Sequence, residues 1–226
     1  MSRPRRQVTL CYLVLLALVL AGCGGGTRER GHATLWITRD RGAHVLMVRD
    51  VPVGINAIQA LDRVAEIETR YGGRYVQSID GIEGSLSDRS DWFWFVNGIE
   101  GDRSAAEYRL HPGDIEWWDY RSWAKQMRQP VVVGAFPEPF LHGFGGKRPR
   151  AVVIGRQRGA HALARLVRGT VASQAPEGAN VLRLIRAAPR FTAHERAGGG
   201  VEFVFAGDAR RLAAHPSLYR FRYEVP

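Results

Sequence analysis

The residue types that most often carry catalysis occur in this sequence, but their spacing does not suit the chemistry they would perform. The seven histidines are scattered, at positions 32, 44, 111, 142, 161, 194 and 215. No two histidines are spaced so that both would lie on one face of a helix as zinc ligands. His194-Glu195 begins like the motif of a zinc hydrolase helix, but the second histidine, four residues after the first, is missing. A Gly-x-Ser-x-Gly elbow is also absent from the sequence. The pattern predicts no metal, no cofactor and no enzymatic activity, with a triad of residues distant in the sequence as the alternative.

One glycine-rich segment suggests phosphate binding, but the spacing of its residues does not fit that function either. Gly143, Gly145 and Gly146 precede Lys147. Their spacing is not that of a phosphate-binding loop, and no serine or threonine follows the lysine. We interpret the segment as part of a long loop punctuated by proline and glycine.

Aromatic residues on two expected strands point to binding instead. Residues 91–98 read DWFWFVNG, and residues 115–120 read IEWWDY. Because side chains alternate across a strand, Trp92 and Trp94 point to one side of the first strand and its phenylalanines to the other. Trp117 and Trp118 likewise point to opposite sides of the second strand. Both strands are therefore apolar on both sides, unlike a half-solvated antiparallel strand.

A sheet that is apolar on both faces needs two covers, and the sequence predicts only one helix in this half of the chain. The second face must be covered by the other half, by a ligand or by a partner, because large exposed apolar patches are uncommon on soluble monomers. In one interpretation the rings are all core residues. In the other, some of them form a platform for a flat apolar molecule. The predicted ligand-binding residues are Trp92, Trp94, Trp117, Trp118 and Tyr120.

Local patterns predict the elements that position these rings. Strands are expected at 33–38, 44–48, 74–79, 91–96 and 115–120, and a helix within 55–67. Asn97-Gly98 is a strong signal for a tight turn, and Pro112-Gly113-Asp114 forms another. We interpret Asn97 as a turn former rather than a ligand contact.

These pieces together resemble a known family. The order of a β-hairpin, VPVGINAIQAL, YVQSIDGI, WFWFVNG and HPGDIEWWDY is similar to the transcobalamin-like C-terminal domain over about residues 33–123. The most specific pieces are Trp92 with Val96-Asn97-Gly98, and Pro112-Gly113-Asp114 before an aromatic strand. The resemblance implies a β-grasp architecture. It also implies cobalamin as a ligand, because in animal carriers this domain closes over the corrin ring. Nothing in this sequence resembles the helical barrel that completes the site in those carriers.

The N-terminus has the parts of a lipoprotein signal. MSRPRR is basic, residues 8–20 are almost wholly apolar, and Leu20-Ala21-Gly22 precede Cys23. This arrangement resembles the lipobox of bacterial lipoproteins. It implies removal of residues 1–22, a lipid on Cys23 and a place on the extracytoplasmic face of the cell membrane. An ordinary cleaved signal is the alternative. Of the two cysteines, Cys11 would be removed, so no internal disulfide is expected.

Charge divides the rest of the chain. Residues 28–129 hold 14 Lys+Arg against 16 Asp+Glu, a net of −2, and residues 130–226 hold 15 against 6, a net of +9. This asymmetry favours two domains. The expected segments are a signal peptide (1–22), a lipidated cysteine with a flexible spacer (23–32), a transcobalamin-like β-grasp domain (33–125) and a small basic α/β domain (131–226). An anionic surface suits the basic half, and a general preference for arginine explains it equally well.

The fold class predicted for the chain is α+β: a β-grasp-like domain, in which one helix lies across a mixed sheet, followed by a small α/β domain. In the second domain we expect strands at 131–133, 151–154, 181–185, 191–194, 201–205 and 218–225, and helices at 159–171 and 206–215.

The predicted function is that of a lipid-anchored extracytoplasmic binding protein for a flat apolar small molecule. A corrinoid is the named ligand, and a transporter in the same membrane is the expected partner. Nucleic acid is not expected outside the cell. The alternative is a structural or protein-interaction lipoprotein whose second domain covers the aromatic face, and a third interpretation is an uncharacterised envelope enzyme. Burial of the rings discriminates the first two.

Overall fold

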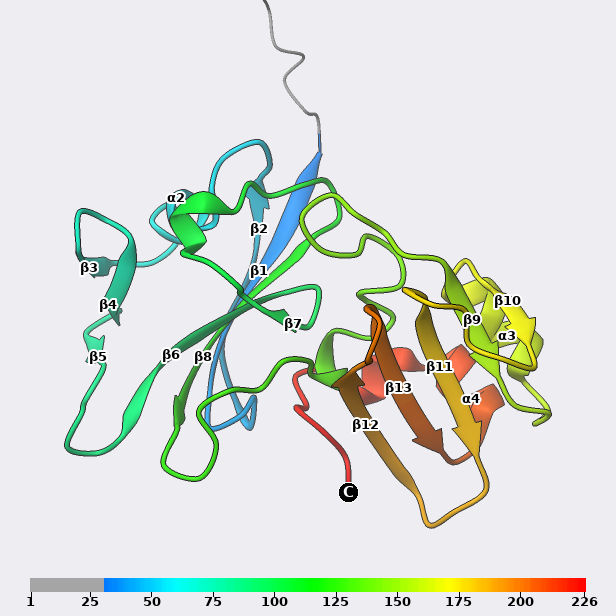
Figure 1. The fold of residues 1–226 in the computed structure, drawn as a ribbon. Coiled ribbons are helices and arrows are strands. Elements are labelled where there is room, and N and C mark those ends of the chain that lie inside the picture. Colours follow the sequence, from blue (N-terminus) through cyan, green and yellow to red (C-terminus); the bar gives the residue numbers. More distant parts are fainter. Residues whose placement is uncertain (1–30) are drawn as a thin grey trace, which may run out of the picture.

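A computed structural model describes residues 31–226 of the chain. They form a mixed α+β structure that consists mostly of strands, with short helices (Figure 1). Cys23 and the expected signal peptide lie outside the described residues. None of the helices in residues 31–226 has the length and apolar character that crossing a bilayer requires.

A five-stranded sheet forms the centre of the first half. Its strands are β1 (His32–Arg39), β2 (His44–Pro52), β6 (Ser90–Val96), β7 (Ile99–Glu100) and β8 (Ile115–Ser122), in the order β2-β1-β8-β6-β7. The central strands β1 and β8 run parallel, and every other pair is antiparallel. A small separate sheet contains β3 (Ile67–Arg70), β4 (Tyr75–Ile79) and β5 (Ile82–Glu83). The five strands expected here are present, while β3, β5 and β7 were not predicted.

The helix expected within 55–67 is much shorter than its pattern suggests. Only α2 (Ala57–Leu61) forms, and it starts with a capping box in which Asn56 and Gln59 bond each other's backbone N–H groups. After it the chain turns, and Glu66 bonds Asp80 beyond the end of β4. Pairing with β4 thus takes Ile67 into β3. A short 3-10 helix, η2 (Ala105–Glu107), lies beside α2.

The two faces of the first sheet carry different core clusters, as the alternation predicts. Trp92, Val96 and Trp118 pack with α2 and with Val76 and Ile79 of β4. Phe95 and Trp117 pack on the opposite side with Trp36. The prediction that both strands are apolar on both sides is confirmed.

The second half contains a five-stranded sheet with helices on one face (Figure 1). Its elements are β9 (Ala151–Ile154), α3 (Ala160–Leu166), β10 (Thr170–Ala172), β11 (Asn180–Ile185), β12 (Arg190–Glu195), β13 (Val201–Ala206) and α4 (Ala209–Ala214). The order is β10-β9-β11-β13-β12, and only the edge strand β12 is antiparallel to its neighbour. Leu163, Leu182, Phe203 and Leu212 belong to the core between this sheet and its helices.

Three predictions for the second half are wrong. Residues 131–133 are not a strand: Val131 forms a single bridge with Ile99, and a 3-10 helix, η3 (Val133–Ala135), follows. The helix expected at 159–171 stops at Leu166, because residues 170–172 pair with β9 as β10. The closing strand expected at 218–225 is replaced by η4 (Pro216–Tyr219) and an irregular tail, in which Phe221 has φ 62°. In that tail only Val225 bridges a strand residue, Phe191.

The second half covers the face of the first sheet that α2 leaves open. Val132, Ala135 and Tyr223 complete the cluster around Trp36, Phe95 and Trp117, with Phe221 packed at its edge. Of the three covers that the sequence allowed for this face, the structure has the chain's own second half.

Candidate ligand site beside the first sheet

Four of the five predicted ligand-binding residues share one face of the sheet, and Trp117 lies on the other. Trp117 is fully buried, and the ring of Tyr223 packs edge-on against it at 5.6 Å. Its Nε1 donates a hydrogen bond to Thr38 Oγ1 at 2.8 Å. The expectation that Trp117 is presented on an open platform is therefore wrong, because the second half encloses it.

The other four rings lie on the side of α2 and β4. Trp92 and Trp118 are 6% and 2% exposed, whereas Trp94 and Tyr120 are half-buried. Trp94 stacks on Trp118 with ring centroids 6.2 Å apart, and Trp92 lies 5.3 Å from Tyr120. These rings form a continuous aromatic layer, of which Trp94 and Tyr120 make the accessible part.

Most polar atoms of these rings bond to the protein itself. Trp92 Nε1 donates to the Ile82 carbonyl at 2.8 Å, and the Tyr120 hydroxyl donates to the Glu83 carbonyl at 3.0 Å. Trp118 Nε1 donates to Glu116 Oε1 at 2.6 Å. Two of these bonds attach β5 to the first sheet. The rings thus position the small sheet, rather than offering their polar atoms to a ligand.

A small hollow lies over this aromatic layer. It has a volume of about 200 Å³ and is lined by Ile58, Arg74, Tyr75, Val76, Trp92, Trp94, Arg103, Ser104, Ala105 and Trp118. Both arginines pair with acidic neighbours, Arg74 with Glu107 and Arg103 with Asp102. Three of the predicted ligand-binding residues thus line one hollow, and Tyr120 and Trp117 do not.

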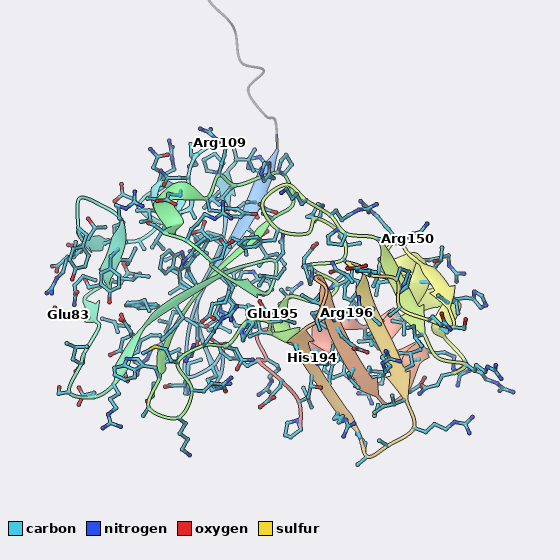
Figure 2. The ribbon with its side chains drawn as sticks, in the orientation of Figure 1. Glu83, Arg109, Arg150, His194, Glu195 and Arg196 are labelled. Carbon is cyan, nitrogen blue, oxygen red and sulfur yellow. The ribbon has the colours of Figure 1, made fainter. Side chains whose placement is uncertain are left out.

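A larger hollow opens on the other side of Tyr75. Its volume is about 590 Å³, and its lining residues are Arg70, Tyr71, Tyr75, Gln77, Glu83, Gly84, Ser85, Leu86, Ser87, Ser90 and Asp91. The lining comes from the small sheet and from the loop that leads into β6. Glu83 lies at the edge of the first half that faces away from the second half (Figure 2). Tyr75 lines both hollows and so connects the polar one with the aromatic one.

The polar groups of the larger hollow are already ordered. The Tyr75 hydroxyl donates to Asp91 Oδ2 at 2.5 Å, and Gln77 Nε2 donates to Glu83 Oε1 at 2.9 Å. Arg70 pairs with Glu83 at 3.6 Å. Burial raises the pKa of Tyr75, and the hydrogen bond to Asp91 raises it further, so the phenol stays protonated at neutral pH. The hollow is thus lined by a phenol, an amide, two carboxylates and a guanidinium that bond to one another.

Two large apolar side chains stand exposed at this hollow. Leu86 is 87% exposed and Tyr71 is 78% exposed, the two highest values among the large apolar residues of the described chain. Tyr71 has φ 53°, in the left-handed region that non-glycine residues seldom adopt, and its ring meets that of Tyr75 edge-on at 6.0 Å. Strain of this kind persists where surrounding structure imposes it, and it clusters at functional sites.

Sequence reasoning missed the residues of the larger hollow. They lie on β3, β4 and a loop rich in glycine, serine and aspartate, where no apolar period marks them. One signal was present: Leu86 is the only large apolar residue between Glu83 and Asp91. Such a leucine in a polar loop has nothing local to pack against.

The turn residues that carry the family resemblance have structural roles. Asn97 is buried with φ 54°, and it bonds Asp114 Oδ1 at 2.7 Å, the Gly143 carbonyl at 2.8 Å and the Ile115 N–H at 2.8 Å. Gly98 has φ 79° and Gly113 has φ 85°, while Pro112 packs against Gly31. Asn97 lies in the turn between β6 and β7, with its backbone in the left-handed region. Its side chain also connects the first sheet to the loop of the second half.

Within residues 31–226, no group of three or more histidine, cysteine, aspartate or glutamate side chains is arranged to hold a metal ion. Carboxyl groups do lie buried: burial raises the pKa of Asp114, Asp119 and Glu138. Each of them accepts hydrogen bonds from neighbouring protein groups. Their arrangement is that of structural acids.

Comparison with known proteins places a family match on the region of both hollows. The family described as a domain of unknown function, DUF4430, matches residues 54–122, a range that includes every residue that lines them. No curated protein matches the chain.

Two solved structures show weak likeness to it. One is a protein from Ruminococcus gnavus ATCC 29149 described as a candidate metal binding protein, with 14% identity and a TM-score of 0.35. That match covers 41% of this chain and 98% of the other. The second is haptocorrin in complex with Cbi, with 16% identity and a TM-score of 0.36, covering 45% of this chain and 27% of haptocorrin. Neither likeness assigns a ligand to this chain.

Proposed function

We propose that this chain is a lipid-anchored extracytoplasmic binding protein whose ligand site is the pair of hollows that share Tyr75. The observation that carries the proposal is the larger hollow, where Leu86 and Tyr71 expose apolar side chains beside an ordered set of polar groups. Its volume of about 590 Å³ lies within the range of roughly 300–1,000 Å³ that is usual for small-molecule sites. Exposed apolar side chains around a few convergent polar groups are typical of such sites.

The chemistry of the lining favours a ligand with an apolar face and polar groups at its edge. Tyr71 and Leu86 can cover the apolar face. Gln77, Glu83 and Asp91 can bond amide or hydroxyl groups. A corrinoid, which has amide side chains around a planar ring, fits this description and agrees with the family resemblance, so it is the first ligand to test. Delivery to a transporter in the same membrane completes the proposed role, which is non-enzymatic and requires no cofactor.

The architecture that we propose for residues 33–125 is a β-grasp, followed by an α/β domain from residue 131. The strand order β2-β1-β8-β6 with β1 parallel to β8 supports the first assignment. Separate sheets with their own core clusters support the division into two domains. The lipid on Cys23 is supported by the sequence motif, and mass spectrometry of the protein extracted from membranes tests it.

Calorimetric titration tests the ligand site. The full-length chain in non-ionic detergent is titrated with cobinamide and with cyanocobalamin. Removing a large side chain that a ligand covers costs about 1.5–3 kcal/mol, so we expect Tyr71→Ala and Leu86→Ala each to weaken binding at least about tenfold. Leu218→Ala is the matched control, because Leu218 is 53% exposed and lies on η4 of the second half.

The outcomes separate the corrinoid from the site. Absence of heat with both corrinoids removes them as ligands. If a corrinoid binds and the three variants bind it equally well, the site lies elsewhere and the assignment to the Tyr75 hollows is wrong.

A structural or protein-interaction lipoprotein is the second candidate, and one observation favours it. The second half encloses Trp36, Phe95 and Trp117, as that interpretation requires. The two candidates differ at Tyr71 and Leu86. If these side chains bind a protein, cross-linking from position 86 in cells gives a discrete larger species, whereas a small-molecule site gives none.

A further inference from the structure

Three loops of the second half are strongly basic. Residues 155–159 read GRQRG, residues 186–190 read RAAPR and residues 207–211 read GDARR. Together they contain six arginines and a single acidic residue, Asp208. They follow the strands β9, β11 and β13, respectively.

The fold brings these loops to one edge. Strands β9, β11 and β13 are parallel neighbours, so their carboxyl ends lie together (Figure 1). Gln157 Nε2 donates to the Ile185 carbonyl at 2.6 Å, which ties the first loop to the second. Gly159 lies against α4, since a Cβ there would stand 2.7 Å from the backbone nitrogen of Arg210. The GRQRG loop is therefore held between the other two.

The arginines of this edge are poorly neutralised. Asp208 caps α4 by accepting from the Arg210 N–H and stands 3.8 Å from the Arg210 guanidinium. In the part of the chain that the structure describes, no ion pair involves the other five arginines of the edge. These exposed side chains are Arg156, Arg158, Arg186, Arg190 and Arg211. Like charges held together repel, and a bound anion removes that cost. Guanidinium groups suit phosphate because they bond it in bidentate fashion.

The order of the strands also points to the edge formed by these three loops as a binding site. After β9 the chain passes through α3 to β10 on one side of the sheet, whereas after β11 it passes to β12 on the other side. The direction in which the sheet grows thus reverses between β9 and β11. In doubly wound sheets, ligands bind at the carboxyl ends of the strands where such a reversal occurs, and this sheet shares the reversal although its helices lie on one face.

We propose that this edge binds a phosphate-bearing anion with at least two negative charges, through Arg156 and Arg158 of the GRQRG loop together with Arg186 and Arg190. A soluble phosphate ester and a phospholipid headgroup share this chemistry. The site is independent of the Tyr75 hollows and of the proposed corrinoid.

Calorimetry with pyrophosphate tests the proposal on the full-length chain in non-ionic detergent, at constant ionic strength set with chloride. The test variant is Arg156→Ala/Arg158→Ala. The matched control is Arg165→Ala/Arg168→Ala, which removes the same charge from two exposed arginines of α3 and the turn that follows it. Bonds between charged partners are the strong ones, so we expect the test variant to weaken binding at least about tenfold and the control to change it less than about twofold.

Vesicles with and without cardiolipin, whose headgroup carries two phosphate groups, form the second arm. The measured quantity is the part of the association that requires cardiolipin, because a lipid anchor binds both kinds of vesicle. Loss of vesicle association in the test variant alone, without binding of pyrophosphate, identifies the headgroup as the source of the phosphate. Arg156→Lys/Arg158→Lys keeps the charge and checks folding, and it should retain part of the affinity. Equal losses in the test and control variants would show only general charge attraction, and the proposal would fall. No binding in either arm also overturns it.

Discussion

Replacing Tyr223 tests whether the second half encloses the aromatic face of the first sheet. The side chain is 3% exposed, its ring lies 5.5 Å from Phe95 and 5.6 Å from Trp117, and its hydroxyl donates to Asp119 at 2.8 Å. Removing a buried aromatic ring costs about 3–5 kcal/mol of unfolding free energy, so we expect Tyr223→Ala to lose that amount.

Tyr223→Phe separates the ring from the hydroxyl. Asp119 keeps Thr38, the Gly42 N–H and the Arg41 N–H as donors, so the loss of one hydrogen bond should cost about 1–2 kcal/mol. Urea unfolding followed by tryptophan emission measures both variants. In native Tyr223→Ala we also expect a red shift, because water gains access to Trp117.

Tyr71→Ala is the matched control for Tyr223→Ala. It removes the same side chain from a position that is 78% exposed, and we expect a change below about 0.5 kcal/mol. If Tyr223→Ala loses no more stability than Tyr71→Ala, the second half does not cover this face in solution. The rings would then be open to a ligand or a partner.

Two further predictions concern buried polar groups. Glu116 is fully buried, burial raises its pKa well above the usual value, and Oε2 has no partner among the described residues. Because the pKa of Glu116 is higher in the folded state, its contribution to the free energy of unfolding is fully present below the unfolded-state pKa of about 4.3. This contribution is lost as the pH rises through the folded-state pKa, by about 1.4 kcal/mol for each pH unit between the two pKa values. In urea unfolding, Glu116→Gln should therefore have the same free energy of unfolding as the parent at pH 4 and a higher one at pH 8. A lower value for the variant at pH 8 would mean that the carboxylate charge is stabilising. Asn97→Ala should cost about 2–4 kcal/mol, because it removes three hydrogen bonds and strains a left-handed backbone. Asn97→Gly should keep the turn without strain and cost less, and equal thermal shifts of the two variants would contradict the backbone contribution.

The strands of the first sheet could be predicted from the sequence because their signals are local. Alternation in residues 91–96 and 115–120 identified both the strands and the faces of their side chains. The length of α2 could not be predicted in this way. Residues 62–67 keep a helical apolar period, but the bonds between Glu66 and Asp80 and the pairing of Ile67 with Ile79 take them out of the helix.

The wrong predictions for the second half also arise from contacts between residues distant in the sequence. Val131-Val132-Val133 has strong β propensity, but the Val132 N–H bonds the Gly98 carbonyl and the Val133 N–H bonds the Tyr223 carbonyl, so no continuous ladder forms with one strand. The tail at 218–225 alternates as a strand would, yet Tyr223 points into the first sheet while Val225 bridges Phe191. The conformation of a segment that joins two cores is determined by its contacts with both of them. The partners lie far away in the sequence: Val131 bridges Ile99, and the Tyr223 hydroxyl bonds Asp119, 104 positions away.

In the first half, the residues that hold the fold together differ from those that line the proposed ligand site. The motif that resembles the transcobalamin-like domain places Asn97 and Asp114 in one buried network, where Asp114 also accepts from the His111 N–H. That network ties the first sheet to the Gly143 carbonyl, so it maintains the fold whatever the ligand is. The hollow with exposed apolar side chains is built instead from residues 70–91, which contain none of the most specific pieces of the resemblance. Matching the motif therefore indicates the scaffold, and under the proposed function residues 70–91 determine which ligand the hollow accepts.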